Sequence, residues 1–134
     1  MALSGINKGA LSRLGINAVC YMADSDVAAE AASRGVTRAA VSMEKAARLS
    51  GHLIFAIGNA PTALLRLKEL IEKNEVSPRL IIGVPVGFVN VVEAKELIMT
   101  AGVPYIVARG RKGGSTVAAA ICNALLYMAE DASY

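Results

Sequence analysis

The chain has few aromatic residues and no long apolar run. Tryptophan is absent, and aromatic residues make up 4% of the 134 residues. Crossing a bilayer takes about 20 consecutive apolar residues, so no membrane span is expected, and without an opening signal segment we expect a cytoplasmic protein. Nucleic-acid binding usually needs a long basic stripe with aromatic residues for stacking, so that class is disfavoured as well.

Histidine and cysteine are also scarce, which excludes several kinds of site. His52 is the single histidine, so a histidine-rich metal cluster is excluded. Cys20 and Cys122 lie far apart and form no C-x-x-C motif, so neither a zinc site nor a disulfide framework is expected. We therefore predict no metal site. Any acid–base chemistry has to use His52, carboxylates or groups from elsewhere.

The composition that remains is that of one folded domain, which we place at residues 1–134. Hydrophobic residues make up 54% of the chain and charged residues 19%, which is low for a soluble monomer. We therefore expect part of the apolar surface to lie in an oligomer interface. The net charge is +3, and no acidic residue occurs from Leu97 to Ala129, where Arg109, Arg111 and Lys112 lie together.

Short apolar runs alternate with segments of helical period after Ala18, a pattern typical of a parallel sheet with crossover helices. We predict an α/β fold, a three-layer α/β/α arrangement with a mainly parallel sheet of about four or five strands buried on both faces. The expected strands are Ala18 to Met22, His52 to Ile57, Arg79 to Val84 and Pro104 to Ala108. The expected helices are Asp26 to Arg34, Arg38 to Leu49, Asn59 to about Lys73, Asn90 to Ala101 and Thr116 to Glu130.

Capping residues mark the ends of these helices. Gly35 suits a helix C-terminus, and Asn59 with Pro61 after it suits a helix N-terminus. Asn90 and Glu93 have the spacing of a capping box. The expected N-caps of the second and last helices are Thr37 and Ser115.

The loop from Arg109 to Ser115 carries the strongest chemical signal. Ligands of open α/β sheets bind beyond the carboxyl ends of the strands, where this loop lies. Its glycines, basic side chains and following helix start predict an anion site. Neither a P-loop nor a G-x-G motif is present. A tight strand-to-helix turn with solvated basic residues is the alternative interpretation.

A second candidate group lies at two other helix starts. Arg66 follows Thr62 by four residues, so both lie on one helical face and could reach one ligand. From spacing alone, an N-cap followed by a solvent-facing arginine is the simpler interpretation. Thr37 and Arg38 likewise fit a cap and a surface charge. His52 begins a strand and therefore should lie at the amino end of the sheet, opposite the predicted site.

Several motifs resemble those of one known family. Residues 57–64 read IGNAPTAL, 82–89 read IGVPVGFV, 110–115 read GRKGGS and 123–126 read NALL. Together with GIN at 5–7, Cys20, Asp24 and GVTR at 35–38, they resemble the precorrin-8X methylmutase family of cobalamin biosynthesis. The resemblance covers essentially the whole chain. It implies an isomerase that moves a methyl group from C11 to C12 of a corrin precursor without an organic cofactor.

The resemblance also implies partners and site residues. The expected substrate is precorrin-8 or cobalt-precorrin-8, a flat macrocycle rimmed with carboxylates, and the expected assembly is a homodimer. Val86 and Phe88 suit the ring face of that substrate. The substrate-binding residues expected are Thr37, Arg38, Asn59, Thr62, Arg66, Arg111, Lys112, Gly113, Gly114 and Ser115.

Two departures from the family pattern bear on catalysis. Members usually carry a further N-terminal region with the histidine that protonates the substrate; we expect this chain to begin after that point, and His52 does not match that histidine. Ala94 stands where the family commonly has serine. Three hypotheses for the function remain. The first is a short-form methylmutase, and the second is a non-catalytic corrinoid-binding protein or half of a split enzyme. The third is a small-anion or nucleotide-binding α/β module.

Overall fold

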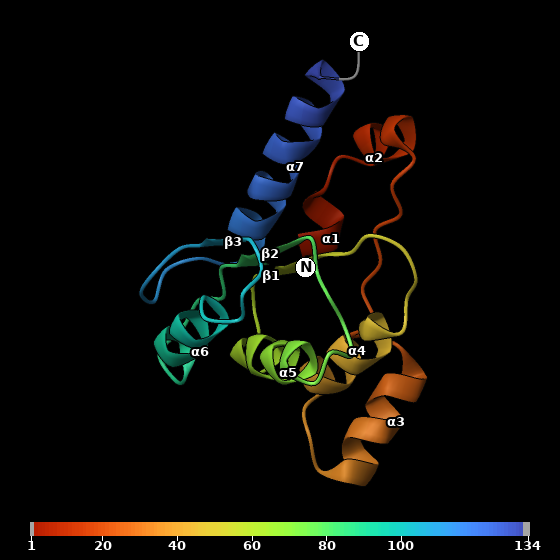
Figure 1. Cartoon of the computed structure of the whole chain (residues 1–134). Coiled ribbons are helices and arrows are strands. Elements are labelled where there is room, and N and C mark those ends of the chain that lie inside the picture. Colours follow the sequence, from red (N-terminus) through yellow and green to blue (C-terminus); the bar gives the residue numbers. More distant parts are fainter. Residues whose placement is uncertain (1, 133–134) are drawn as a thin grey trace.

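Residues 2–132 are described by a computed structural model, in which helices cover both faces of a small sheet (Figure 1). The elements in chain order are α1 (Ala2–Gly5), α2 (Lys8–Leu14), α3 (Ser25–Arg34), α4 (Arg38–Ala47), β1 (Ile54–Ile57), α5 (Pro61–Glu72), β2 (Leu80–Gly83), α6 (Val91–Ile98), β3 (Tyr105–Val107) and α7 (Ser115–Asp131).

Three layers are evident in Figure 1. Helices α4, α5 and α6 pack side by side beneath the sheet, with α5 between the other two. The opposite face is covered by α7, which contacts β1, β2, α1 and α2. Helix α3 packs against α4 rather than against the sheet. The predicted three-layer α/β/α architecture is therefore confirmed.

The sheet is smaller than predicted. Its strands run in the order β1-β2-β3, all parallel, with Ile54 opposite Leu80 and Ile81 opposite Tyr105. Within residues 2–132 it has three strands, not four or five, because the expected strand from Ala18 to Met22 has no strand partner. The aromatic and thioether side chains of that run pack against helix residues instead, while Val19 stays exposed.

Only the central strand is buried on both faces as predicted. Ile81 and Ile82 of β2 are fully buried and, as neighbours on a strand, point to opposite faces. Ile54 on β1 is 58% exposed and Tyr105 on β3 is 45% exposed. Both edge strands therefore present apolar surface that the described residues do not cover.

The two faces of β2 contribute to two separate apolar cores. Ile81 belongs to the larger core with Leu64, Leu67 and Ile98 from α5 and α6. Ile82 packs with Ala118 of α7 on the other face. Because adjacent residues of one strand belong to different cores, a shift of β2 by one residue would misplace both.

Helix ends follow the predictions only in part. Gly35 ends α3 in the left-handed conformation (φ 66°), Thr37 caps α4 through its side chain, and Pro61 opens α5, all as predicted. Helix α4 ends at Ala47, two residues before the predicted Leu49, and α6 ends at Ile98 instead of Ala101.

Two predicted N-caps and one predicted capping box are wrong. Asn59 and Ser115 are displaced as N-caps by their neighbours Ala60 and Gly114. Asn90 does occupy the N-cap position of α6, but its backbone is left-handed (φ 60°) and its side chain makes no capping bond. A capping box requires an extended N-cap residue, so the pairing with Glu93 does not form.

Helices α1 and α2, which are not among the predicted elements, are held by α7. The Asn7 backbone N–H donates to Asn123 Oδ1 (2.7 Å), and its Nδ2 donates to the Tyr127 hydroxyl (3.2 Å). The Asn123 side chain donates in turn to the Gly5 carbonyl (3.0 Å). The GIN and NALL motifs, which are far apart in sequence, thus meet at one contact. Among the helices of residues 2–132, none has the length and apolar content to span a membrane.

Candidate functional site

The loops that follow the three strands meet at the carboxyl edge of the sheet. The loop after β3 is bonded to the loop after β2 twice: the Gly114 N–H donates to the Val84 carbonyl (2.8 Å), and the Gly87 N–H donates to the Arg111 carbonyl (3.1 Å). Backbone bonds of this kind fix the loops without using any side chain. The side chains at this edge therefore remain available to a ligand.

Glycine is required at two positions by the close approach of these loops. A Cβ atom on Gly113 would lie 2.1 Å from the Val84 carbonyl oxygen. On Gly58, after β1, a Cβ atom would lie 2.8 Å from the Gly114 oxygen and from the Cα atom of Ser115. No larger residue fits at either place without moving backbone. The three loops thus form one continuous backbone frame.

A buried lysine lies beneath the loop of residues 109–115, the basic loop, which carries Arg109, Arg111 and Lys112. Lys95 of α6 is 1% exposed, and its Nζ donates to the carbonyls of Ala108 (2.6 Å), Gly110 (2.9 Å) and Lys112 (2.9 Å). Burial lowers the pKa of the Lys95 ammonium from its ordinary value.

Lys95 is not among the predicted site residues, although its place on α6 carries a signal. The other buried residues of α6 are Val91, Ala94 and Ile98, so lysine falls on the inward stripe of that helix. A charged residue at an apolar position is seldom buried without specific partners. That position could have singled out Lys95.

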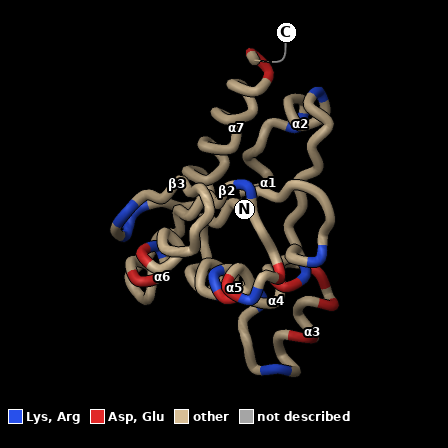
Figure 2. Tube along the Cα trace, in the orientation of Figure 1, with Lys and Arg blue, Asp and Glu red and all other residues tan. Residues whose placement is uncertain are grey.

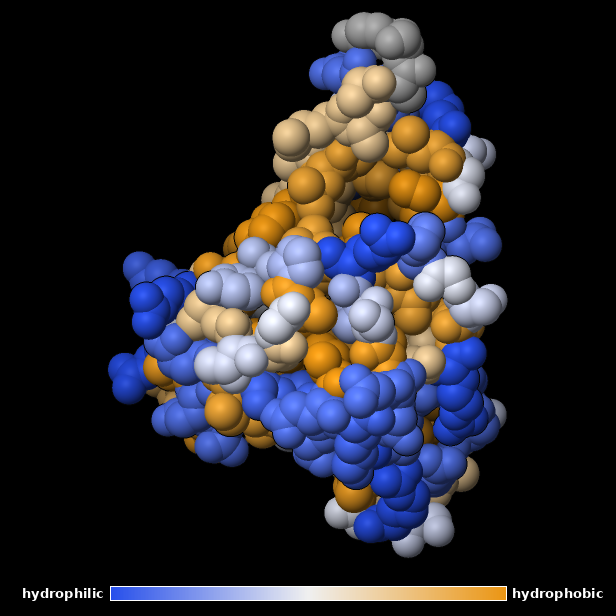
Figure 3. Space-filling model, viewed as in Figure 1, coloured by the Kyte–Doolittle hydropathy of each residue, from blue (hydrophilic) through white to orange (hydrophobic). Residues whose placement is uncertain are grey.

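The exposed surface of this edge combines positive charge with apolar side chains. The basic loop extends from the body of the protein between β3 and α7 (Figure 2). Arg111 lies over the Phe88 ring, with its guanidinium carbon 5.5 Å from the ring centroid. Phe88 is 81% exposed, and Val86 and Val89 are exposed beside it in sequence. Apolar side chains and cations therefore lie next to one another at this edge. In Figure 3 the largest hydrophilic area lies elsewhere, over the helices in the lower part of the view.

The three basic residues of the loop differ in their partners. Arg109 pairs with Glu96 (2.8 Å), and that carboxylate raises the pKa of the guanidinium. Arg111 and Lys112 are exposed and take part in none of the ion pairs found among residues 2–132. Two cations are therefore free to meet an anionic ligand. Helix α7, whose N-terminus no side chain caps, begins at Ser115, three residues after Lys112.

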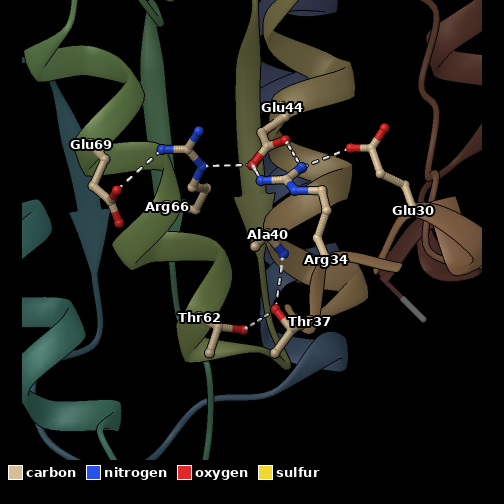
Figure 4. A network of polar contacts seen from close by, with 8 residues as sticks. All are labelled: Glu30, Arg34, Thr37, Ala40, Glu44, Thr62, Arg66 and Glu69. Carbon is tan, nitrogen blue, oxygen red and sulfur yellow. Dashed lines mark hydrogen bonds and ion pairs between the residues drawn. The ribbon is translucent and has the colours of Figure 1, made fainter. Parts of the chain in front are cut away.

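The second candidate group joins the starts of α4 and α5 (Figure 4). The Thr37 hydroxyl accepts from the Ala40 N–H (3.1 Å) and donates to the Thr62 hydroxyl (3.2 Å). Thr62 lies on α5 just after Gly58, the residue that touches the start of α7. The threonine pair and the basic loop thus border the same edge. Asn59, three residues before Thr62, is exposed.

Arg66 lies one turn further along α5, on the side that faces α4 (Figure 4). Its guanidinium donates to Glu44 (2.8 Å) and Glu69 (3.1 Å). Glu44 also pairs with Arg34 (2.6 Å); that hydrogen bond is the main cause lowering the pKa of the Glu44 carboxyl to about 2. Arg66 shares a face with Thr62 as predicted, but its guanidinium is occupied by two carboxylates.

The remaining predicted residues lie apart from these contacts. Arg38 is exposed at the start of α4. His52 is exposed just before β1, at the amino edge as predicted, with its Nε2 3.5 Å from Arg79 Nη2. A shallow hollow lined by Arg66, Glu44, Arg48 and Glu75, among others, lies along α4 and α5, further from the starts of these helices than the threonine pair. Residues 2–132 contain no cluster of three or more metal-ligating side chains.

Comparisons with known proteins give one consistent result. A family model described as precorrin-8X methylmutase matches residues 1–128. A cobalt-precorrin-8 methylmutase of Priestia megaterium is 48% identical over 130 residues, which are 97% of this chain and 58% of that protein. The protein of that name from Salmonella typhimurium is 46% identical over 133 residues, with 98% and 61% covered.

The solved structures agree with the sequences. The crystal structure of a precorrin-8x methyl mutase from Thermus thermophilus superposes with a TM-score of 0.87 at 41% identity, covering 98% of this chain and 64% of that one. A precorrin-8X methylmutase related protein superposes with a TM-score of 0.83 at 34% identity, covering 95% and 66%. The chain therefore spans about three fifths of the length of the curated relatives it matches.

Proposed function

Since the chain belongs to the precorrin-8X methylmutase family, we propose that it binds precorrin-8 or cobalt-precorrin-8 and acts as an isomerase that moves a methyl group from C11 to C12 of this corrin precursor. The observation that carries the proposal is the carboxyl edge of the sheet. There, two unpaired cations stand beside exposed apolar side chains on a fixed backbone frame.

The chemistry of the substrate matches that edge. A corrin precursor is flat and apolar across its ring and anionic at its rim. Phe88, Val86 and Val89 offer apolar contact to a ring face. Arg111 and Lys112, with the start of α7, offer positive charge to the rim carboxylates. Each part of the ligand therefore has a counterpart among adjacent residues.

The other predicted contacts complete the proposed binding surface. Thr37, Arg38, Asn59 and Thr62 lie at the starts of α4 and α5 or just before them, and Gly58, which precedes Asn59, contacts the backbone of Gly114. Hydroxyl and amide groups at helix starts suit the polar substituents of the rim. Arg66 would contribute from one turn deeper, by exchanging a carboxylate of this chain for one of the ligand.

The position of the histidine favours a second candidate function. Protonating the ring would assist the methyl shift, and a general acid typically contributes a factor of about 10²–10⁴. His52, the histidine of the printed sequence, lies at the opposite edge of the sheet and cannot serve as that acid. This placement favours a corrinoid-binding protein without methyl transfer, or one half of a split enzyme whose acid comes from another polypeptide.

The decisive experiment follows the visible absorption of cobalt-precorrin-8 after addition of the purified chain. Conversion to the spectrum of the rearranged product would establish the methylmutase. A saturable spectral shift without conversion would support the binding protein or split enzyme instead. No change at any concentration would refute corrinoid binding by this chain.

A pair of variants shows whether the proposed edge is the place of binding. Arg111→Gln with Lys112→Gln removes both free cations and is expected to raise Kd at least fivefold, about 1 kcal/mol. Lys73→Gln, at the exposed end of α5, removes a cation elsewhere and should leave Kd unchanged. Equal affinities of all three proteins would place the ligand elsewhere.

We also propose a homodimer located in the cytoplasm. Val117, Tyr127 and Met128 of α7 are exposed apolar residues, and a further copy of the chain would remove such surface from water. Sedimentation of the purified chain at two concentrations tests the assembly, and a monomer at both would refute it. Cell fractionation tests the location, which stays a prediction from the sequence.

A further inference from the structure

Three carbonyl oxygens converge on one buried amine. Lys95 Nζ lies 2.6–2.9 Å from the carbonyl oxygens of Ala108, Gly110 and Lys112. A carbonyl only accepts hydrogen bonds, so three of them require three N–H donors. A neutral amine has two, whereas the ammonium has three. The geometry therefore identifies Lys95 as a buried cation, although burial favours the neutral form.

No carboxylate among residues 2–132 forms an ion pair with this cation. The ion pairs found among residues 2–132 do not include Lys95. Its partners are the negative ends of three peptide dipoles, all from the basic loop. The full positive charge thus stays beneath the segment that carries Arg111 and Lys112.

The bonds to Lys95 alternate along the loop. The carbonyls of residues 108, 110 and 112 point to the ammonium, and the carbonyl of Arg111 between the last two accepts from the Gly87 N–H. Each of these four oxygens already has a donor within the protein. The partial negative charges of these four carbonyls are therefore satisfied within the protein and do not repel a ligand at this edge.

We propose that Lys95 is a positioning residue of the anion site: its ammonium holds the carbonyls of Ala108, Gly110 and Lys112, so that these oxygens are turned away from the carboxylates of the ligand and the cations of the loop face them. This inference rests on the proposed function for the nature of the ligand. The arrangement of the loop itself does not depend on it. Lysine at this position keeps anion affinity high although Lys95 never touches the ligand.

The test compares Lys95→Met with Lys68→Met and the parent chain. Methionine keeps the length and apolar stem of lysine but provides no donor. Lys68 lies on α5 and pairs with Glu72, so its replacement is the same chemical change away from the loop. Limited digestion with trypsin, read by mass spectrometry without any ligand, reports cleavage after Arg109, Arg111 and Lys112.

We expect cleavage in the loop to be at least tenfold faster in Lys95→Met than in the parent chain. The thermal unfolding temperature of Lys95→Met should equal that of the parent. In Lys68→Met the cleavage rate should stay within twofold of the parent rate. The Kd for cobalt-precorrin-8 should rise in Lys95→Met alone. A loop as well protected as in the parent would overturn the proposal. Faster cleavage with unchanged Kd would overturn the link to anion binding.

A second variant decides the matter if Lys95→Met does not fold. Lys95→Gln keeps two N–H donors and is expected to give an intermediate cleavage rate. If neither variant folds by circular dichroism, Lys95 serves the whole domain and the local role is refuted. If no protein in the series binds the corrinoid, the proposed function fails, while the cleavage rates still decide whether Lys95 holds the loop.

Discussion

Glu44 should make the stability of the protein strongly dependent on pH between about 4.5 and 2. Its carboxylate accepts from both Arg34 and Arg66 and its side chain is 13% exposed. These partners lower its pKa from an ordinary 4.5 to about 2, with Arg34 the larger cause. At 1.36 kcal/mol per pKa unit, this shift corresponds to at most about 3 kcal/mol of folding free energy.

The sign of the effect follows from the direction of the shift. A carboxyl group whose pKa is lower in the folded state stabilises that state fully above its unfolded pKa, and the contribution disappears as the pH falls through the folded pKa. Because the Arg34 guanidinium is 42% exposed, solvent screening reduces the expected value to about 1–3 kcal/mol. Glu44→Gln should therefore be less stable than the parent at pH 7 by this amount, and the difference should vanish towards pH 2.

Urea unfolding followed by circular dichroism at pH 7, 4 and 3 measures this difference. Glu30→Gln is the matched control, because Glu30 pairs with the same Arg34 but is 43% exposed, so its loss should cost less than about 0.5 kcal/mol. Parallel pH profiles of Glu44→Gln and the parent would refute the reasoning. An equal loss in the two variants would show that burial of Glu44 contributes nothing.

Three further substitutions test the proposed edge and its supports. Gly113→Ala places a Cβ atom 2.1 Å from the Val84 oxygen, so the loop must move; tryptic cleavage of the loop should accelerate and the Kd for cobalt-precorrin-8 should rise about tenfold. Thr62→Val removes the acceptor of the Thr37 hydroxyl and should cost about 1 kcal/mol in urea unfolding, with an unchanged value indicating that the bond contributes nothing. Arg66→Ala should weaken corrinoid binding severalfold, and an unchanged Kd would remove this arginine from the site.

The sequence predicted the layers because periodicity reports which sides of an element are buried. Strand β2 and helix α5 appear where their apolar patterns place them. The run from Ala18 to Met22 has the composition of a strand but lacks a partner, and pairing is a tertiary property that no local pattern contains. Helix α2 was missed although local signals were present: the Asn7 side chain caps it by accepting from the Ala10 N–H, and Gly15 ends it in the left-handed conformation (φ 68°).

The candidate site was predictable to a similar extent. Glycines and basic residues marked the loop after β3, and the structure places that loop against its neighbours as expected for strand ends of a parallel sheet. The pairing of Arg66 with Glu44 could not be foreseen, because the two residues come from different helices. Spacing along a chain indicates which residues share a face, but not which residue of another element already occupies it.

The backbone frame at the carboxyl edge separates two kinds of sequence position. At Gly58 and Gly113 backbone contacts backbone, so a change of residue there alters the shape of the whole edge. Phe88, Arg111 and Lys112 are exposed on that frame, and the contact between Arg111 and the Phe88 ring joins two of these side chains to each other. The ligand preference of this domain can therefore be redesigned one side chain at a time, with the glycines kept as fixed points and the fold unaffected.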